Sequence, residues 1–167
     1  MITRAEIENA LKTKGEIVQI DHLKRFLIKA DNLDIKKYIL LRLAGINESH
    51  GFLLDAAKNI DTAADISITF KEKKELYMKE AEIYVKLGNF IMADAVLQKA
   101  LTQATMKEKR ECQDKYLEFY NIHGRINENA GRHRKSLEYY EKLYSIPQSD
   151  EKKAEIVKNI FNDTLNE

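Results

Sequence analysis

The side chains of this chain that are suited to catalysis or metal binding are those of its histidines and its aspartates and glutamates. The chain has four histidines: His22, His50, His123 and His133. None stands at the helical spacing from another histidine or from a carboxylate that a recognisable metal motif needs. The helical carboxylates, such as Glu75 and Glu82, have a lysine four residues later and are typical of a solvated face. The spacing therefore predicts no catalytic residue, no metal site and no cofactor, and we expect no enzyme activity.

Aromatic side chains crowd one part of the sequence. They are Tyr116, Phe119, Tyr120, Tyr139, Tyr140 and Tyr144. Aromatic residues spaced four apart pack along the seam between two helices, so this cluster predicts a helical core. The alternative is that some of these rings, such as Tyr139, line a groove for a partner protein, because tyrosine is enriched at interfaces.

A basic run occupies residues 132–135. Arg132, Arg134 and Lys135 are typical of a solvated turn, and the alternative is a contact with an anion or a nucleic acid. Residues 5–44 offer a second nucleic-acid alternative, because short helices with a basic surface could form a helix-turn-helix. The turn expected at 14–20 is longer than that motif uses, and no β-wing follows. A protein partner is therefore the leading prediction.

Three glycines separate the elements that must position these residues. Gly45, Gly88 and Gly131 lie 43 residues apart, and the apolar residues around them recur in the same register. Internal repetition of this kind predicts a stack of helical hairpins with a turn at each glycine, and such stacks usually bind other molecules. Gly51 falls inside the expected return helix of the first repeat, where glycine weakens a helix by ~1 kcal/mol relative to alanine.

Capping residues and apolar periodicity predict the bounds of the helices. The expected helices include 4–13, 21–30 with Asp21 as its cap, 32–44 and 49–60 in the first repeat, and a last helix starting at Ser149 or Asp150. Thr69 with Glu72 and Thr105 with Glu108 each predict a capping box that opens a long helix. We expect one domain made of an N-terminal hairpin, three repeats and a capping helix, with the bounds 1–31, 32–61, 66–104, 105–147 and 149–167.

The composition favours an all-α fold without disulfides. The 167 residues include one proline and six glycines, so helix breakers are few. Twenty-eight basic and 27 acidic residues give a net charge of +1, which argues against a nucleic-acid coat or a polybasic membrane anchor. Cys112 is the one cysteine, no signal peptide begins the sequence, and no apolar run is long enough to span a membrane. We therefore expect a cytoplasmic protein without a membrane partner.

The second repeat resembles the tetratricopeptide repeat. The matching packing positions are Tyr77, Ala81, Tyr84, Gly88, Phe90, Ala93, Leu97 and Ala100. The other two repeats match at fewer positions, and the 43-residue period exceeds the family's 34. The resemblance implies an all-α, right-handed superhelix of antiparallel helix pairs. Its concave face, lined by the first helix of each pair, would bind a peptide or an amphipathic helix of another protein.

This resemblance predicts an adaptor or scaffold protein. The expected partner-binding residues are Ile35, Ile39, Met78, Glu82, Val85, Asn121 and Arg125 on the first helices, together with Tyr139. Some family members hold a partner's C-terminal carboxylate in a clamp, but Glu82 occupies a clamp position here and would repel it. We therefore expect no clamp, and mixed polar and apolar contacts instead. Self-association through the exposed end helices is a further expectation.

Overall fold

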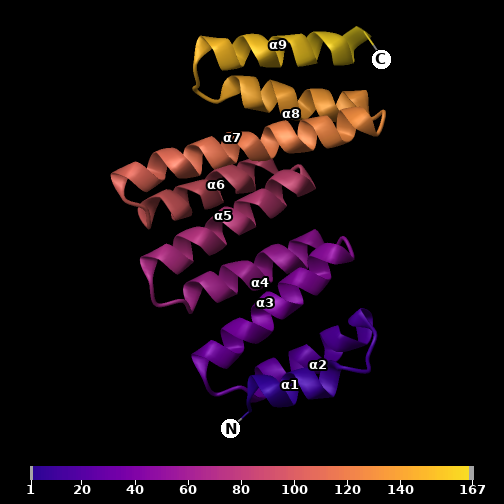
Figure 1. Cartoon of the computed structure of the whole chain (residues 1–167), viewed down its shortest axis with the longest axis vertical. Helices are drawn as coiled ribbons and strands as arrows, with labels where there is room; N and C mark the ends of the chain where they lie inside the picture. The colour runs from indigo at the N-terminus through magenta and orange to yellow at the C-terminus, as the bar shows by residue number, and fades with distance from the viewer. Residues whose placement is uncertain (1, 166–167) are drawn as a thin grey trace.

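The computed structural model describes residues 2–165, apart from the side chain of Asp163, and over that range shows stacked helices without a strand (Figure 1). The helices are α1 (Arg4–Leu11), α2 (Glu16–Lys29), α3 (Leu33–Ser49), α4 (Leu53–Asp65), α5 (Phe70–Leu87), α6 (Phe90–Thr102), α7 (Met106–Asn129), α8 (His133–Ser145) and α9 (Asp150–Leu165). The expected all-α class is confirmed.

Three antiparallel helix pairs form the body of the stack: α3 with α4, α5 with α6, and α7 with α8. The second helix of every pair has 13 residues, whereas the first helices have 17, 18 and 24 residues. In Figure 1 the turns within the pairs lie along the right-hand edge, and the loops that join successive pairs lie along the left-hand edge. The hairpin of α1 and α2 packs on α3, and α9 packs on α8.

The turn of the first pair lies at Gly51 and not at Gly45. The glycines with a left-handed backbone at the turns, with φ of 77°, 82° and 70°, are Gly51, Gly88 and Gly131. Gly45 lies inside α3, because the helix continues and buries Ile46 and Asn47. The burial of these side chains outweighs the ~1 kcal/mol that a glycine costs in a helix. The uniform 43-residue period is therefore wrong, since the turn glycines stand 37 and then 43 residues apart.

The second helix begins earlier than the sequence predicts. α2 starts at Glu16, and Asp21, the expected cap, lies within it. The side-chain amide of Gln19 donates to the carbonyl of Lys14 at 2.8 Å and closes the turn before the helix. The turn between α1 and α2 therefore spans only residues 12–15, and the long turn expected there is wrong.

The fourth helix ends later than the sequence predicts. α4 runs to Asp65, beyond the expected helix end at residue 60, because Ala63 and Ala64 are fully buried and extend its apolar face. The later bounds agree more closely with the expectation. α5 ends at Leu87, and the backbone N–H of Lys152 points to the Ser149 hydroxyl at the start of α9, with an N–O distance of 3.5 Å.

The N-caps confirm one of the two expected capping boxes. Thr105 accepts a hydrogen bond from the backbone N–H of Glu108, whose carboxylate accepts from the Thr105 N–H at 2.8 Å. Thr69 likewise accepts from the backbone N–H of Glu72 at 3.2 Å, but the Glu72 carboxylate lies 2.8 Å from Lys37 Nζ of α3. The second box is therefore only half formed, because its glutamate joins two helices instead.

The aromatic cluster forms a core between the last two pairs. Its fully buried rings are Tyr120, Tyr139 and Tyr140. The first two each meet the ring of Phe90 in α6 edge to face, with centroids 5.2 Å apart. Gly124 leaves room for the third, since a Cβ atom there would lie 2.6 Å from the tyrosine ring. The expected core is confirmed, although Tyr144 is 43% exposed.

Alanine substitutions test the register of the first pair. Gly45→Ala should stabilise the protein by ~1 kcal/mol, because the position is helical, exposed and open to a methyl group. Gly51→Ala should destabilise it by about 1–2 kcal/mol, because alanine is strained at a positive φ. Urea unfolding followed by circular dichroism measures both changes. A loss of stability in both variants would contradict the shifted register.

Candidate functional site

Ion pairs join the first helices of successive pairs to one another, and join the last of them, α7, to α9. They connect Lys37 with Glu72, Glu48 with Lys79 and Lys86, Lys74 with Glu108, Lys152 with Asp114, and Arg125 with Glu155. α3, α5, α7 and α9 therefore lie side by side with charged groups across each junction. Much of the polar surface of this face is already engaged within the chain.

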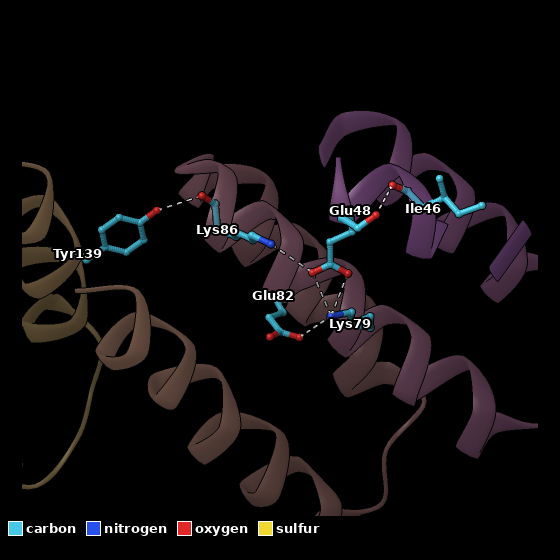
Figure 2. A network of polar contacts seen from close by, with 7 residues as sticks. Ile46, Glu48, Lys79, Glu82, Lys86 and Tyr139 are labelled. Atoms are coloured by element: carbon cyan, nitrogen blue, oxygen red, sulfur yellow. Dashed lines mark hydrogen bonds and ion pairs between the residues drawn. The ribbon is translucent and has the colours of Figure 1, made fainter. Parts of the chain in front are cut away.

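The junction of α3 with α5 has the densest of these networks. Figure 2 shows the Glu48 carboxylate between the amino groups of Lys79, at 3.3 Å, and Lys86, at 3.5 Å. Lys79 Nζ also lies 3.2 Å from the Glu82 carboxylate. Burial alone would lower the pKa of Lys79, but the carboxylates of Glu82 and Glu48 outweigh it and raise that pKa. The network fastens the first pair to the second.

Half of the expected partner-binding residues belong to the core. Ile39 and Val85 are fully buried, Met78 is 6% exposed and Tyr139 is 1% exposed, so their expected role at a partner surface is wrong. Tyr139 instead donates its hydroxyl to the carbonyl oxygen of Val85 at 2.8 Å. It also donates to that of Lys86 at 3.3 Å, and Figure 2 shows this second contact. The physical reason is that each first helix is covered by neighbours on both sides, so only a narrow strip meets solvent.

The other four expected residues do not converge on one site. Ile35 and Glu82 are half-buried on α3 and α5. Asn121 is half-buried and lines a cavity of 220 Å³ between α7, α8 and α9. Arg125 is exposed, and its guanidinium lies 3.7 Å from the Glu155 carboxylate of α9. Two of these residues therefore face the last helix rather than a surface shared with α5.

The basic run lies at the first turn of α8. Arg132, the N-cap residue, and Arg134 and Lys135 are exposed. In Figure 1 this turn lies on the right-hand edge, together with the turn between α1 and α2. The positive charges stand at the positive end of the α8 dipole, which disfavours them locally. The run is thus exposed, as expected, and its residues do not form a ligand-binding site with other described parts of the chain.

A larger cavity of 810 Å³, which we call the α6–α7 groove, lies between α6, α7 and the loop that joins α8 to α9. Its apolar lining consists of Leu97, Leu101, Leu117, Ile146 and Pro147. Its polar lining includes Gln98, Gln113, Gln148, Arg110, Asp94, Asp114, Lys142 and Lys152. None of these lining residues belongs to a sequence motif that predicts a site.

The groove exists because α7 is longer than the helix that packs on it. α8 covers the second half of α7, where the Ser136 hydroxyl donates to the carbonyl of Gly124 at 2.9 Å. α8 has only 13 residues against 24 in α7, so it ends before it reaches the first turns of α7. Figure 1 shows α7 extending well beyond α8 on the left-hand side. The space left there is bounded by α6.

The charges along the groove are compensated at all positions except one. Asp94 accepts hydrogen bonds from Lys142 and from the Tyr116 hydroxyl, both at 2.6 Å. Asp114 lies 3.7 Å from Lys152 Nζ. Arg110 is exposed and joins no ion pair within residues 2–165. The groove therefore combines an apolar floor with one uncompensated guanidinium.

The comparison with known proteins supports the same architecture. Residues 74–104 and 117–150 match the family model of the tetratricopeptide repeat. These matches cover most of α5, all of α6, the second half of α7 and all of α8. Two segments of the chain therefore match tetratricopeptide repeats, and the chain forms an all-α solenoid of stacked helix pairs.

The matches also mark where the chain departs from the repeat unit. Residues 106–116, the first half of α7, lie outside both matched segments and contribute Arg110, Gln113 and Asp114 to the groove. No curated protein and no solved structure matches the chain. Among the described helices, none combines the length and the apolar character that crossing a bilayer requires.

A buried carboxylate lies at the junction of the first and second pairs. Glu80 of α5 is 2% exposed, and its Oε2 atom has no hydrogen-bond partner. Burial, reinforced by the nearby carboxylates of Asp61 and Asp65 in α4, raises the pKa of Glu80 to about 7, although Lys99 of α6 opposes the shift. Lys99 lies closer to another acid, since its amino group is 2.7 Å from Asp61 Oδ1.

Removal of this charge should change how stability depends on pH. The pKa of Glu80 is about 7 in the folded chain and lower in the unfolded chain, so the folded chain binds this proton more tightly. The stability that the bound proton contributes is complete below pH ~4.5 and is lost as the pH rises through 7. Glu80→Gln should therefore gain stability relative to the native chain as the pH rises from 5 to 8, by about 2–3 kcal/mol. Urea unfolding across this range measures the difference, with Glu75→Gln on the exposed side of α5 as the control. A difference that stays constant with pH would contradict the assignment.

Proposed function

We propose that this protein is an adaptor that binds a peptide segment of another protein in the α6–α7 groove and performs no catalysis. Tetratricopeptide repeats generally mediate protein–protein interactions and are typically scaffolds. The observation that carries the proposal is the groove itself, because it combines volume, an apolar floor and an uncompensated positive charge. A cytoplasmic setting fits Cys112, a buried free thiol.

The size and lining of the groove suit a short extended segment. Its 810 Å³ fall within the range of ligand pockets, which bury apolar groups and use a few polar groups for orientation. Leu97, Leu101 and Leu117 would cover the apolar side chains of the segment. Gln98 and Gln113 are exposed at the groove, and their amides can both donate to and accept from a peptide backbone.

The charge of the groove favours a segment with a carboxylate. The guanidinium of Arg110 can hold a carboxylate with two parallel hydrogen bonds. The other two cations of the lining, Lys142 and Lys152, already face Asp94 and Asp114. We therefore expect an aspartate, a glutamate or a chain terminus next to the apolar residues of the partner.

The face of the first helices is the weaker location for this function. Its charged groups form ion pairs within the chain, and three of the residues expected to bind there, Ile39, Met78 and Val85, are buried. A substitution of Glu82 can still test that face, because Glu82 is half-buried and its carboxylate faces Lys79. Met78 does not serve, since its truncation would open a cavity in the core.

Self-association has separate support at the end of the stack. Val157, Phe161 and Leu165 of α9 are 49%, 62% and 70% exposed. Their spacing of four residues places them on one face of the helix. A second copy of the chain could cover this apolar face, as edge helices of repeat arrays do.

Peptides selected against the full chain from a random display library test the groove. The selected peptides should carry a carboxylate beside apolar residues. Their affinity should fall about tenfold or more in Arg110→Glu, because the favourable charge contact becomes repulsive. Leu101→Glu, which places a charge on the apolar floor, should also weaken binding. Fluorescence anisotropy with labelled peptides measures each affinity.

Glu82→Lys is the control, because it reverses a charge on the face of the first helices and leaves the groove intact. The circular-dichroism spectrum of every variant should remain helical. Binding that survives both groove variants and is lost in Glu82→Lys would show that the first-helix face is the site and would refute the groove.

A further inference from the structure

One short sequence occurs twice in the chain, at the starts of α5 and α7. The two copies read Thr69-Phe70-Lys71-Glu72-Lys73-Lys74-Glu75 and Thr105-Met106-Lys107-Glu108-Lys109-Arg110-Glu111. They stand 36 residues apart and differ only by phenylalanine for methionine and lysine for arginine. The identity continues more sparsely at this spacing, with Lys79 and Lys115, Glu82 and Glu118, Tyr84 and Tyr120, and Gly88 and Gly124.

The fold explains only some positions of this duplicated segment. Thr69 and Thr105 cap the two helices. Glu72 pairs with Lys37 of α3, and Lys74 pairs with Glu108. The apolar first residue of each helix and the two lysines at the second and fourth helical positions have no such explanation.

The apolar residues of the two segments stand in solvent. Phe70 is 71% exposed and Met106 is 83% exposed, and Ile68, just before the first cap, is 84% exposed. Single exposed apolar side chains are common on protein surfaces. Here, however, the same position is apolar and exposed in two successive first helices, α5 and α7.

The two segments also lie next to each other in space. Lys74 is one helical turn after Phe70, Glu108 is two residues after Met106, and these two charged side chains form an ion pair. The loops that precede both segments lie on the left-hand edge of the stack in Figure 1. Phe70 and Met106 are therefore neighbours along one edge.

The charge of this edge is positive. Lys71 and Lys107 are exposed, Lys73 and Lys109 are half-buried, and none of the four joins an ion pair within residues 2–165. The acids nearest to them, Glu72 and Glu108, already pair with lysines of other helices. The next acids along each helix, Glu75 and Glu111, lie about one turn further from the edge.

The positive patch is confined to the two central loops. The loop before α3 is flanked by Asp31 and Asp34, and the loop before α9 is followed by Asp150 and Glu151. The net charge of +1 for the whole chain therefore hides a local concentration of lysine beside exposed apolar tips. We call the set Ile68, Phe70, Met106, Lys71, Lys73, Lys107 and Lys109 the basic edge.

We propose that the basic edge docks the protein reversibly on an anionic lipid surface. The apolar tips would enter the boundary between headgroups and acyl chains, and the lysines would meet the negative headgroups, as in interfacial membrane binding. A lipid surface fits better than a protein partner, because phenylalanine and methionine replace each other here and neither tip lines either of the two cavities described above. A fluid bilayer accepts tips of different shape, whereas a protein pocket discriminates between them. This contact does not rest on peptide binding in the groove.

A single tryptophan at the edge can report insertion, because the chain contains no tryptophan. Phe70→Trp should show a blue-shifted emission with vesicles of phosphatidylcholine and phosphatidylserine, and quenching when the acyl chains are brominated. Vesicles of phosphatidylcholine alone should leave the emission unchanged. Ile91→Trp is the matched control, since Ile91 is 83% exposed at the start of α6 on the opposite edge. An unchanged emission from Phe70→Trp, or an equal shift in the control, would overturn the proposal.

Charge reversal and apolar replacement separate the two parts of the contact. Lys71→Glu with Lys107→Glu should reduce co-sedimentation with anionic vesicles at least about tenfold, because each lysine near the surface contributes to attraction. Arg134→Glu with Lys135→Glu on the opposite edge is the control and should leave it unchanged. Phe70→Ser with Met106→Ser should also reduce it, while circular dichroism remains helical.

Two results would contradict the proposal. Binding that is lost with the lysines and unaffected by the serine variant would mean simple charge attraction and would refute insertion. Binding of the native chain to soluble polyglutamate without any binding to vesicles would mean an acidic protein partner and would refute the lipid surface.

Discussion

Each helix pair of this chain has an apolar face that only the next pair can cover, and the whole structure depends on that burial. α5 shows the constraint most clearly, because it packs against α4, α6 and α7, and Ala81, Ile83 and Val85 are fully buried. Burial of apolar surface drives this stacking without fixing its direction. Polar contacts add the direction: the Tyr139 hydroxyl binds the end of α5, and ion pairs align successive first helices.

The irregular part of the stack lies in the last pair. The caps Asn32, Thr69 and Thr105 begin the first helices at intervals of 37 and 36 residues, whereas the turn glycines stand 37 and 43 residues apart. The additional residues are therefore within α7. Because α7 is longer than the other first helices, α8 packs on its second half and leaves its start uncovered. That uncovered start becomes one wall of the groove. The family match begins again only at residue 117.

Much of the fold could be predicted from the sequence, because capping residues and apolar spacing act locally. The bounds of α5, the turn at Gly88 and the aromatic core all follow from such signals. The register of the first pair could not be predicted from glycine spacing, because burial of Ile46 and Asn47 keeps Gly45 helical. The spacing of Thr69 and Thr105 contained the better signal, since a cap marks where a helix starts whatever its length.

The proposed binding surface was harder to predict for a related reason. Periodicity shows that Ile39 and Val85 lie on apolar faces, but not that neighbours cover those faces from both sides. The groove has no motif at all, since its lining comes from α6, α7 and the loop before α9, and depends on where α8 ends. The length of α7 was the one local signal that could have indicated an uncovered segment.

Native-state hydrogen exchange of α5 tests the stacking most directly. The amides of Ala81–Val85 should exchange more slowly than those of α9, because α5 is covered by helices on several sides whereas α9 packs chiefly on α8. Exchange in α5 that is as fast as in α9 would show that the second pair is not held between its neighbours, and would contradict the stacked arrangement.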